Sequence, residues 1–170
     1  MNDFSADVRL AKEGSAAAFS RLYSMVYKDL YHIALYSLRS PHDASDVVSD
    51  TVLDAFCSIG KLRDVQSFRS WIMSILSAKI KRRQREYFDT ADELEDETCI
   101  DEFDFDSVEL KEALGKLDSE SRLLLSMAVL GGYTSEELAD ICKIKAGTVR
   151  SRLTRIKKQL RLELTPKLLE

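Results

Sequence analysis

The sequence predicts an all-α protein made of two small helical domains joined by an acidic flexible linker. Apolar residues recur at steps of three and four, and nowhere does an apolar/polar alternation persist at period two, so helices are predicted and strands are not. Only two prolines and six glycines interrupt the 170 residues. An acidic run at 89–109 separates two stretches with helical periodicity, because it holds eleven acids and no Lys or Arg.

The first domain is predicted to span residues 1–88. A short helix is expected at 4–13 and ends at Gly14. Ser15 can cap a long helix at 16–38, whose apolar stripe would face the core. That stripe consists of Phe19, Leu22, Tyr23, Val26, Leu30, Ile33 and Ala34.

The next helix, predicted at 41–59, has two different faces. Ser40 as N-cap and Pro41 at the first helical position form its start signal. One face is apolar and the other is acidic, because four aspartates fall at offsets that share a helical side. The apolar face consists of Ala44, Val47, Val48, Thr51, Val52, Ala55, Phe56 and Ile59. The acidic face consists of Asp43, Asp46, Asp50 and Asp54.

A loop at 60–67 leads into the last helix of this domain, at 67–86, with Ser67 as the expected cap. The C-terminal turns of this helix are basic and read KIKRRQR at 79–85. Its core side consists of Phe68, Trp71, Ile72, Ile75, Leu76 and Ile80.

After the linker, placed at 89–106, a second domain is predicted at 107–170. Thr134 followed by Glu137 forms a capping box, and the tight turn 143–145 leads into a second helix at about 146–162. A short helix, a tight turn and a longer basic helix are the pattern of a helix-turn-helix. The inward positions are Leu138, Ala139 and Ile141 on the first helix and Val149, Leu153, Ile156 and Leu160 on the second.

The charge distribution favours a nucleic-acid partner for this second domain. The net charge of the chain is −4, but without the acidic run the remainder holds 25 basic and 18 acidic residues. The stretch 143–162 has eight basic residues and no acid, where an ordinary solvated helix face mixes both signs. Arginine on such a helix can read guanine, and hydroxyl side chains can contact bases or phosphates. The predicted exposed side carries Arg150, Ser151, Thr154, Arg155 and Lys158.

Other function classes find no support in the sequence. Cys57, Cys99 and Cys142 lie more than forty residues apart and there are only two histidines, so neither a zinc site nor a disulfide framework is expected. No nucleophile–base pair, phosphate-binding glycine loop or metal-ligand cluster indicates an enzyme, and no cofactor is expected. No apolar run approaches the ~18–20 residues of a membrane span, and the first ten residues do not resemble a signal peptide, so direct membrane insertion is not expected and a cytoplasmic location is.

Two longer stretches resemble a known family. LDSESRLLLSMAVLGGYTSEELADICKIKAGTVRSRLTRIKKQL resembles domain four of the bacterial RNA polymerase sigma factors of the sigma-70 family. AFSRLYSMVYKDLYHIALYSLRSPHDASDVVSDTVLDAF and SFRSWIMSILSAKIKRRQRE resemble domain two. The gap between them is too short for another folded domain. This layout is similar to the extracytoplasmic-function (ECF) group, which keeps only domains two and four.

The resemblance implies a transcription initiation factor that binds core RNA polymerase and directs it to promoters. Domain four would read the −35 element and domain two would read and open the −10 element. The implied −35 residues are Thr148, Arg150, Ser151, Arg152, Thr154, Arg155 and Lys158. The implied −10 residues are Lys79, Arg82, Arg83 and Arg85. The implied contacts with the clamp helices of the largest polymerase subunit are Asp43, Asp46, Ser49 and Asp50.

The sequence departs from the family pattern at two of these places and leaves some alternatives open. Ser49 stands where the family usually has Gln, and Ala78 stands where it usually has Asn, which affects the expected −10 preference. The acidic linker is interpreted either as an imitation of a phosphate backbone or as a solubilising spacer. An anti-sigma protein is an expected partner. The alternative function is a helix-turn-helix regulator that binds operator DNA without joining polymerase.

Overall fold

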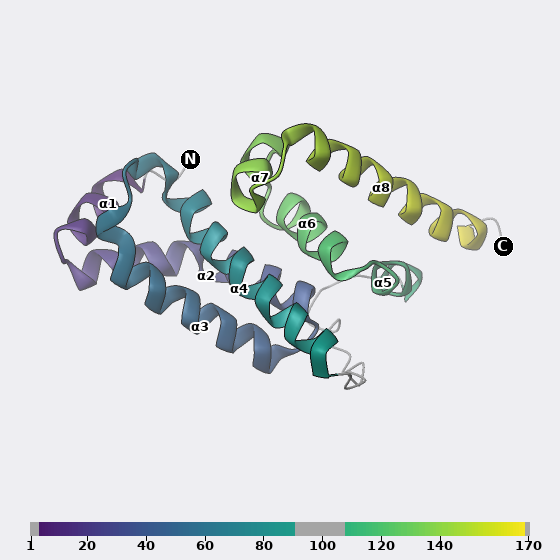
Figure 1. The fold of residues 1–170 in the computed structure, drawn as a ribbon, viewed down its shortest axis with the longest axis horizontal. Coiled ribbons are helices and arrows are strands. Elements are labelled where there is room, and N and C mark those ends of the chain that lie inside the picture. Colours follow the sequence, from purple (N-terminus) through teal and green to yellow (C-terminus); the bar gives the residue numbers. More distant parts are fainter. Residues whose placement is uncertain (1–3, 91–107, 169–170) are drawn as a thin grey trace.

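The computed structural model describes residues 4–90 and 108–168, and all helices and turns in this part of the chain follow one another without a strand. The acidic linker was predicted at 89–106; residues 89 and 90 end a helix, and 91–107 lie outside the described residues. Figure 1 shows the arrangement. The first group of elements is α1 (Ser5–Lys12), α2 (Ala16–Leu38), α3 (Pro41–Ser58), the 3-10 turns η1 (Ile59–Lys61) and η2 (Val65–Ser67), and α4 (Phe68–Thr90). The second is α5 (Val108–Gly115), α6 (Ser119–Val129), α7 (Ser135–Cys142) and α8 (Ala146–Leu168).

The predicted helix starts are confirmed where a side chain caps the helix. Ser15 accepts a hydrogen bond from the backbone N–H of Ala18, and Ser40 accepts one from that of Asp43. These oxygens satisfy backbone donors that have no partner within the helix. The predicted cap at Ser67 is wrong. Asp64 caps the turn η2 instead, and the Ser67 hydroxyl donates to its carboxylate at 2.8 Å.

The first half of the chain packs α2, α3 and α4 side by side around a buried core, with α1 covering one end (Figure 1). Its largest fully buried side chains include Phe68, Leu22, Leu30, Ile33, Ile72 and Leu76. Phe56 was predicted to face inward, but 49% of it is exposed. It lies at the edge of the apolar face and meets Phe19 edge-on, with ring centroids 5.2 Å apart.

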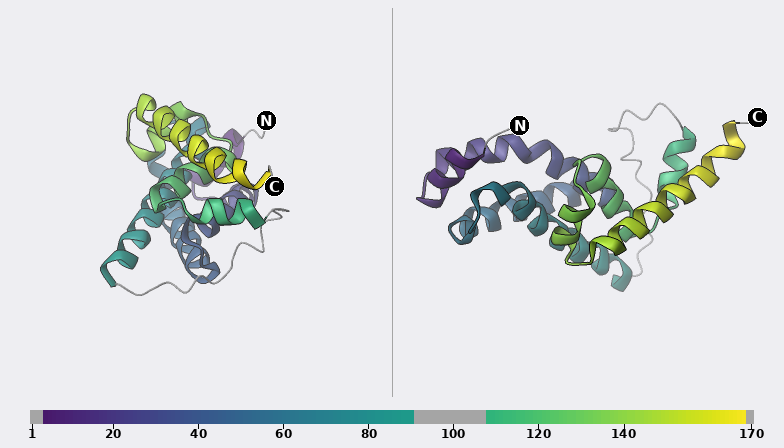
Figure 2. Two further views of the ribbon diagram at one scale, coloured as in Figure 1. Left: turned by 90° about the vertical axis from the view of Figure 1, so that its right-hand side faces the viewer. Right: turned by 90° about the horizontal axis from the view of Figure 1, so that it is seen from above.

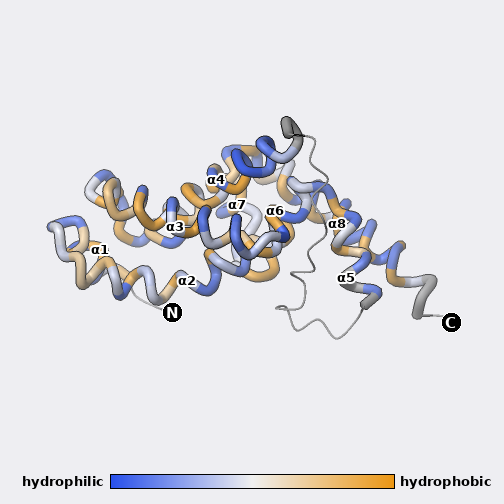
Figure 3. The backbone as a smooth tube through the Cα atoms, turned by 90° about the horizontal axis from the view of Figure 1, so that it is seen from below, coloured by the Kyte–Doolittle hydropathy of each residue, from blue (hydrophilic) through white to orange (hydrophobic). Residues whose placement is uncertain are grey.

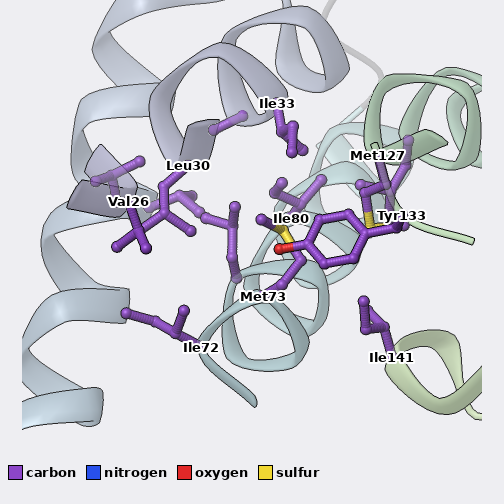
Figure 4. Close-up of a cluster of buried hydrophobic side chains, with 14 of the residues drawn as sticks. Val26, Leu30, Ile33, Ile72, Met73, Ile80, Met127, Tyr133 and Ile141 are labelled. Carbon is purple, nitrogen blue, oxygen red and sulfur yellow. The ribbon is translucent and has the colours of Figure 1, made fainter. Parts of the chain in front are cut away.

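The two halves are in direct contact, which the sequence did not indicate. α6 packs against α2, and α7 packs against α4. One continuous cluster of buried residues runs through both halves, and Figure 4 shows Met73 and Ile80 close to Met127 and Tyr133. α8 packs against α7 and α6, and its C-terminal half runs beside α5 (Figure 2), where Lys116 pairs with Glu163 at 2.6 Å.

The hydropathy of the residues differs between the helices that form the core and α8. Hydrophobic segments run along α2, α3, α4 and α6, whereas hydrophilic positions interrupt α8 throughout its length (Figure 3). None of the helices in the described ranges is both long and apolar enough to cross a bilayer.

Candidate nucleic-acid interface and acidic helix

The helix-turn-helix is built from α7 and α8, and its first helix is fixed by the predicted capping box. Thr134 accepts from the N–H of Glu137 at 3.2 Å, and the Glu137 carboxylate accepts from the N–H of Thr134 at 2.8 Å. Lys143 ends α7 in a left-handed conformation with φ of 56°, which turns the chain sharply into α8. Leu138, Ile141, Val149 and Ile156 are buried and hold the two helices together.

The outer side of α8 is open to solvent. All seven residues predicted to contact the −35 element are exposed. A shallow groove on this face is lined by Lys145, Gly147, Thr148, Ser151, Arg152 and Arg155. A basic, hydroxyl-rich face at the start of the second helix of a helix-turn-helix is suited to the major groove of DNA.

Two of the arginines on this face are held by carboxylates of the same half. Arg150 bonds Glu136 at 3.0 Å and Arg152 bonds Glu120 at 3.3 Å. All four side chains are at least 44% exposed, so these ion pairs are weak and an incoming phosphate or base can replace them at little cost. The carboxylates therefore orient the arginines without blocking the face.

The acidic face of α3 divides into an inner and an outer part. Asp43 is only 16% exposed, accepts a hydrogen bond from the Tyr87 hydroxyl and lies 3.7 Å from Arg83. Burial, together with the Asp43 carboxylate, raises the pKa of Tyr87 well above its ordinary value, so this hydroxyl keeps its proton. Asp46, Ser49 and Asp50 are exposed and remain available to a partner.

The four basic residues of α4 divide in the same way. Lys79 bonds Asp54 of α3 at 2.7 Å, and Arg83 faces Asp43. Arg82 and Arg85 are exposed, and Arg82 lies 3.4 Å from Glu86 of its own helix. Ala78 is exposed as well and presents no hydrogen-bonding group. Half of this basic set therefore ties α4 to α3, and half faces solvent.

Sequence reasoning did not expect two exposed apolar residues beside the acidic face: it assigned Leu53 to no face and Phe56 to the buried one. Leu53 is 63% exposed and Phe56 is 49% exposed, although both are large apolar side chains. Leu53 follows Asp50 by three residues, which puts the two on one side of α3. An apolar residue at helical spacing from an acidic row is the sequence signal that could have identified it.

Arg69 was also missed, and it joins the two halves of the chain. Its guanidinium lies 4.4 Å from the centroid of the Tyr133 ring and donates to the backbone oxygen of Gly131. Tyr133 in turn donates its hydroxyl to the Arg69 carbonyl at 3.4 Å. Burial raises the pKa of Tyr133 to about 12 in spite of the nearby cation. Nothing in the sequence pattern pairs an arginine with an aromatic ring 64 residues away.

The described residues contain no group of three or more His, Cys, Asp and Glu that could hold a metal ion.

Both halves of the chain match models of one known family. Residues 22–87 match the family model of sigma-70 region 2, and residues 107–160 match that of sigma-70 region 4. The chain belongs to the sigma-70 family. A sigma factor is a transcription initiation factor that directs RNA polymerase to promoters, and sigma factors are not enzymes.

Curated relatives of this chain are sigma factors, and several are named as members of the ECF group. This chain is 27% identical over 142 residues to the RNA polymerase sigma factor SigV of Bacillus subtilis, and the match covers 81% of this chain and 86% of that protein. It is 26% identical over 151 residues to the ECF RNA polymerase sigma factor SigM of Mycobacterium tuberculosis, covering 86% and 77%. The predicted ECF group is confirmed. The match to region 2 also disfavours a regulator that acts without polymerase.

Two solved structures share the fold of this sigma factor. CnrH in complex with the cytosolic domain of CnrY has a TM-score of 0.73 at 21% identity, covering 97% of this chain and 99% of that one. The sigma factor RpoE in complex with the anti-sigma factor NepR from Bartonella quintana has a TM-score of 0.67 at 22% identity, covering 86% and 96%. The predicted all-α fold is thereby confirmed.

Proposed function

We propose that this sigma factor divides its work between two surfaces of opposite charge. The exposed acidic side of α3, with Asp46, Ser49 and Asp50, binds the clamp helices of the largest subunit of core polymerase. The outer face of α8 reads the −35 element. The observation that supports this division most is that both surfaces are exposed and that each is dominated by one sign of charge.

Leu53 and Phe56 extend the polymerase surface with an apolar portion. Protein interfaces gain most of their affinity from a few apolar or aromatic anchors, while charges set register and association rate. Asp43 contributes indirectly, because its bonds with Tyr87 and Arg83 hold α3 against α4.

The −10 element is assigned to α4. Arg82 and Arg85 are exposed and can contact phosphates directly. Lys79 and Arg83 would have to leave Asp54 and Asp43 before binding a phosphate. Ala78 offers no hydrogen bond to a base, so discrimination at that position rests on shape.

The boundaries that we propose are 1–88 for the polymerase- and −10-binding domain, 89–106 for the linker and 107–170 for the −35-binding domain. We also propose an anti-sigma partner, because one of the two fold neighbours was solved with an anti-sigma factor and both were solved as complexes. The chain acts in the cytoplasm and catalyses no reaction of its own.

The test is binding to purified core polymerase by the double variant Asp46→Lys and Asp50→Lys. We expect roughly tenfold weaker binding at low salt, because complementary charges become repulsive. The matched control is Glu13→Lys with Asp140→Lys, which changes net charge equally at exposed sites outside α3. Equal loss in both double variants would refute the assignment of α3.

A further inference from the structure

We propose that Glu120 and Glu136 raise the sequence specificity of the outer face of α8, because they hold two of its arginines so that these read bases but bind phosphates less readily. This inference rests on the proposed assignment of the −35 element to α8. It goes further because it gives a role in discrimination to two carboxylates that lie outside the helix that carries the reading residues.

The two glutamates occupy equivalent positions in two different helices. Each is the second residue of its helix, Glu120 in α6 and Glu136 in α7. The capping bonds of these helices are made by other side chains, Asp118 in α6 and the Thr134–Glu137 capping box in α7. Glu120 and Glu136 are therefore not needed for capping, and each reaches across to α8 instead.

The arginines that they hold lie on two sides of α8. Arg150 donates to Glu136 at 3.0 Å, and Arg152 donates to Glu120 at 3.3 Å. Residues two apart differ by about 200° around a helix of 3.6 residues per turn. One arginine therefore faces α7 and the other faces α6, and both of these helices pack against α8 (Figure 1). The two ion pairs flank the reading face.

The other cations of the reading face are not held in this way. Arg155 and Lys158 are exposed, and neither forms an ion pair with a carboxylate within residues 4–90 and 108–168. Arg155 lines the shallow groove of this face together with Gly147 and Ser151. The carboxylates are thus placed at the two edges of the face and leave its centre basic.

Each ion pair uses only one part of the guanidinium. In both pairs the donor is Nη1, and the edge formed by Nε and Nη2 makes no hydrogen bond to the described residues. Arginine carries five N–H donors in a planar fork, so this second edge can donate to O6 and N7 of guanine while Nη1 stays on the carboxylate. A guanidinium that is already oriented also loses less conformational freedom when it binds a base.

A phosphate contact is affected differently. Non-specific binding comes from attraction between basic side chains and phosphates, whereas bases are read through hydrogen bonds to their edges. A glutamate beside the guanidinium offsets its charge and repels the phosphate, which must displace the carboxylate to bind closely. All four side chains are at least 44% exposed, so the effect of each pair is only a few-fold. Specificity rises because this cost applies to contacts that every DNA sequence offers.

Binding of the full chain to two duplexes tests the proposal. One duplex carries a −35 element from a promoter selected with the wild-type chain and core polymerase, and the other has the same base composition in scrambled order. Fluorescence anisotropy at several salt concentrations gives the affinity for each duplex and its salt dependence. The variants are Glu136→Gln, Glu120→Gln and the two combined. The matched control is Asp140→Asn, which removes the charge of an exposed acid on α7 that holds no arginine.

We expect Glu136→Gln to bind the scrambled duplex about fourfold more tightly and to change the affinity for the −35 duplex by less than about twofold. The salt slope for the scrambled duplex should steepen by up to about 0.9, because the released arginine gains one phosphate contact. The combined variant should show a larger effect than either single one. An unchanged affinity ratio and slope in the combined variant, or an equal change in Asp140→Asn, would overturn the proposal.

A background without Arg150 separates the action of Glu136 on its arginine from a general effect of charge. In Arg150→Ala, the further change Glu136→Gln should leave the affinity ratio between the two duplexes unchanged, because no guanidinium remains to be released. A ratio that falls as much as it does with Arg150 present would refute the positioning role. A wild-type chain that does not distinguish the two duplexes would instead refute the proposed reading of the −35 element, and this inference with it.

Discussion

Arginine serves two purposes in this chain, and the surroundings of each side chain decide which. Arg150 is 58% exposed and its partner Glu136 is 71% exposed, so their ion pair is easily exchanged for DNA. Arg69 is 37% exposed and is held by a ring, a carbonyl and a carboxylate. Composition alone does not separate these roles, because exposure and partners are properties of the fold.

The Arg150→Ala variant should weaken binding to −35 duplex DNA by about 1–3 kcal/mol, because a side chain placed to contact bases is removed. Fluorescence anisotropy with a labelled duplex measures the effect. Arg9→Ala, an exposed arginine on α1, serves as the control and should bind normally. Simultaneous loss of core-polymerase binding by Arg150→Ala would point to misfolding and contradict a specific role in DNA reading.

The cysteines provide a second prediction at this scale. Burial raises the pKa of the Cys142 thiol, whereas Cys57 is exposed. A raised pKa means less thiolate at pH 8, and the thiolate is the reactive form. Iodoacetamide should therefore label Cys57 roughly tenfold faster than Cys142, as followed by mass spectrometry of peptides. Labelling of both at one rate would show that Cys142 is not protected by the contact with α4.

At the scale of helices, the predictions succeeded where a local signal was sufficient. Ser15, Ser40 and Thr134 each cap a helix as expected, because capping needs only a side chain and a backbone N–H three residues away. The prediction at Ser67 failed because Asp64, three residues earlier, caps the turn η2 and binds the Ser67 hydroxyl, so Ser67 lies inside a 3-10 turn that leads into α4. A nearby competitor is difficult to rank from sequence alone.

The capping box of α7 should be important for the stability of the helix-turn-helix. Thr134→Ala removes one capping bond and should lower the free energy of unfolding by about 1 kcal/mol. Thr134→Ser keeps the hydroxyl and should retain most of that stability. Urea denaturation followed by circular dichroism measures both variants. Equal destabilisation by Ala and Ser would contradict a role for the hydrogen bond.

At the scale of the whole molecule, the sequence predicted the two helical halves but not the contact between them. Ser77 and Gln84 are buried at this contact, yet they are polar and do not extend the apolar stripe of α4. Met73 is buried too, one turn from Arg69. Since such positions resemble solvent-facing ones in sequence, the contact becomes visible only when α6 and α7 are placed against α2 and α4.

The charge segregation, in contrast, was readable from the sequence, because eight basic residues without an acid at 143–162 need no fold to be recognised. The fold added which members face outward. In the folded chain Asp43 lies 3.7 Å from Arg83, whereas Asp46 and Asp50 are exposed. The seven residues assigned to −35 reading are all exposed, and their contacts with bases remain a prediction.

The most direct measurement of the central claim is transcription by purified core polymerase from a random template library, with and without this chain. The account predicts start sites that appear only when the chain is added and that share an upstream element whose sequence preference changes with Arg150→Ala. If adding the chain yields no promoter-specific transcripts above those of core polymerase alone, the account of two opposed charged surfaces in one initiation factor is contradicted.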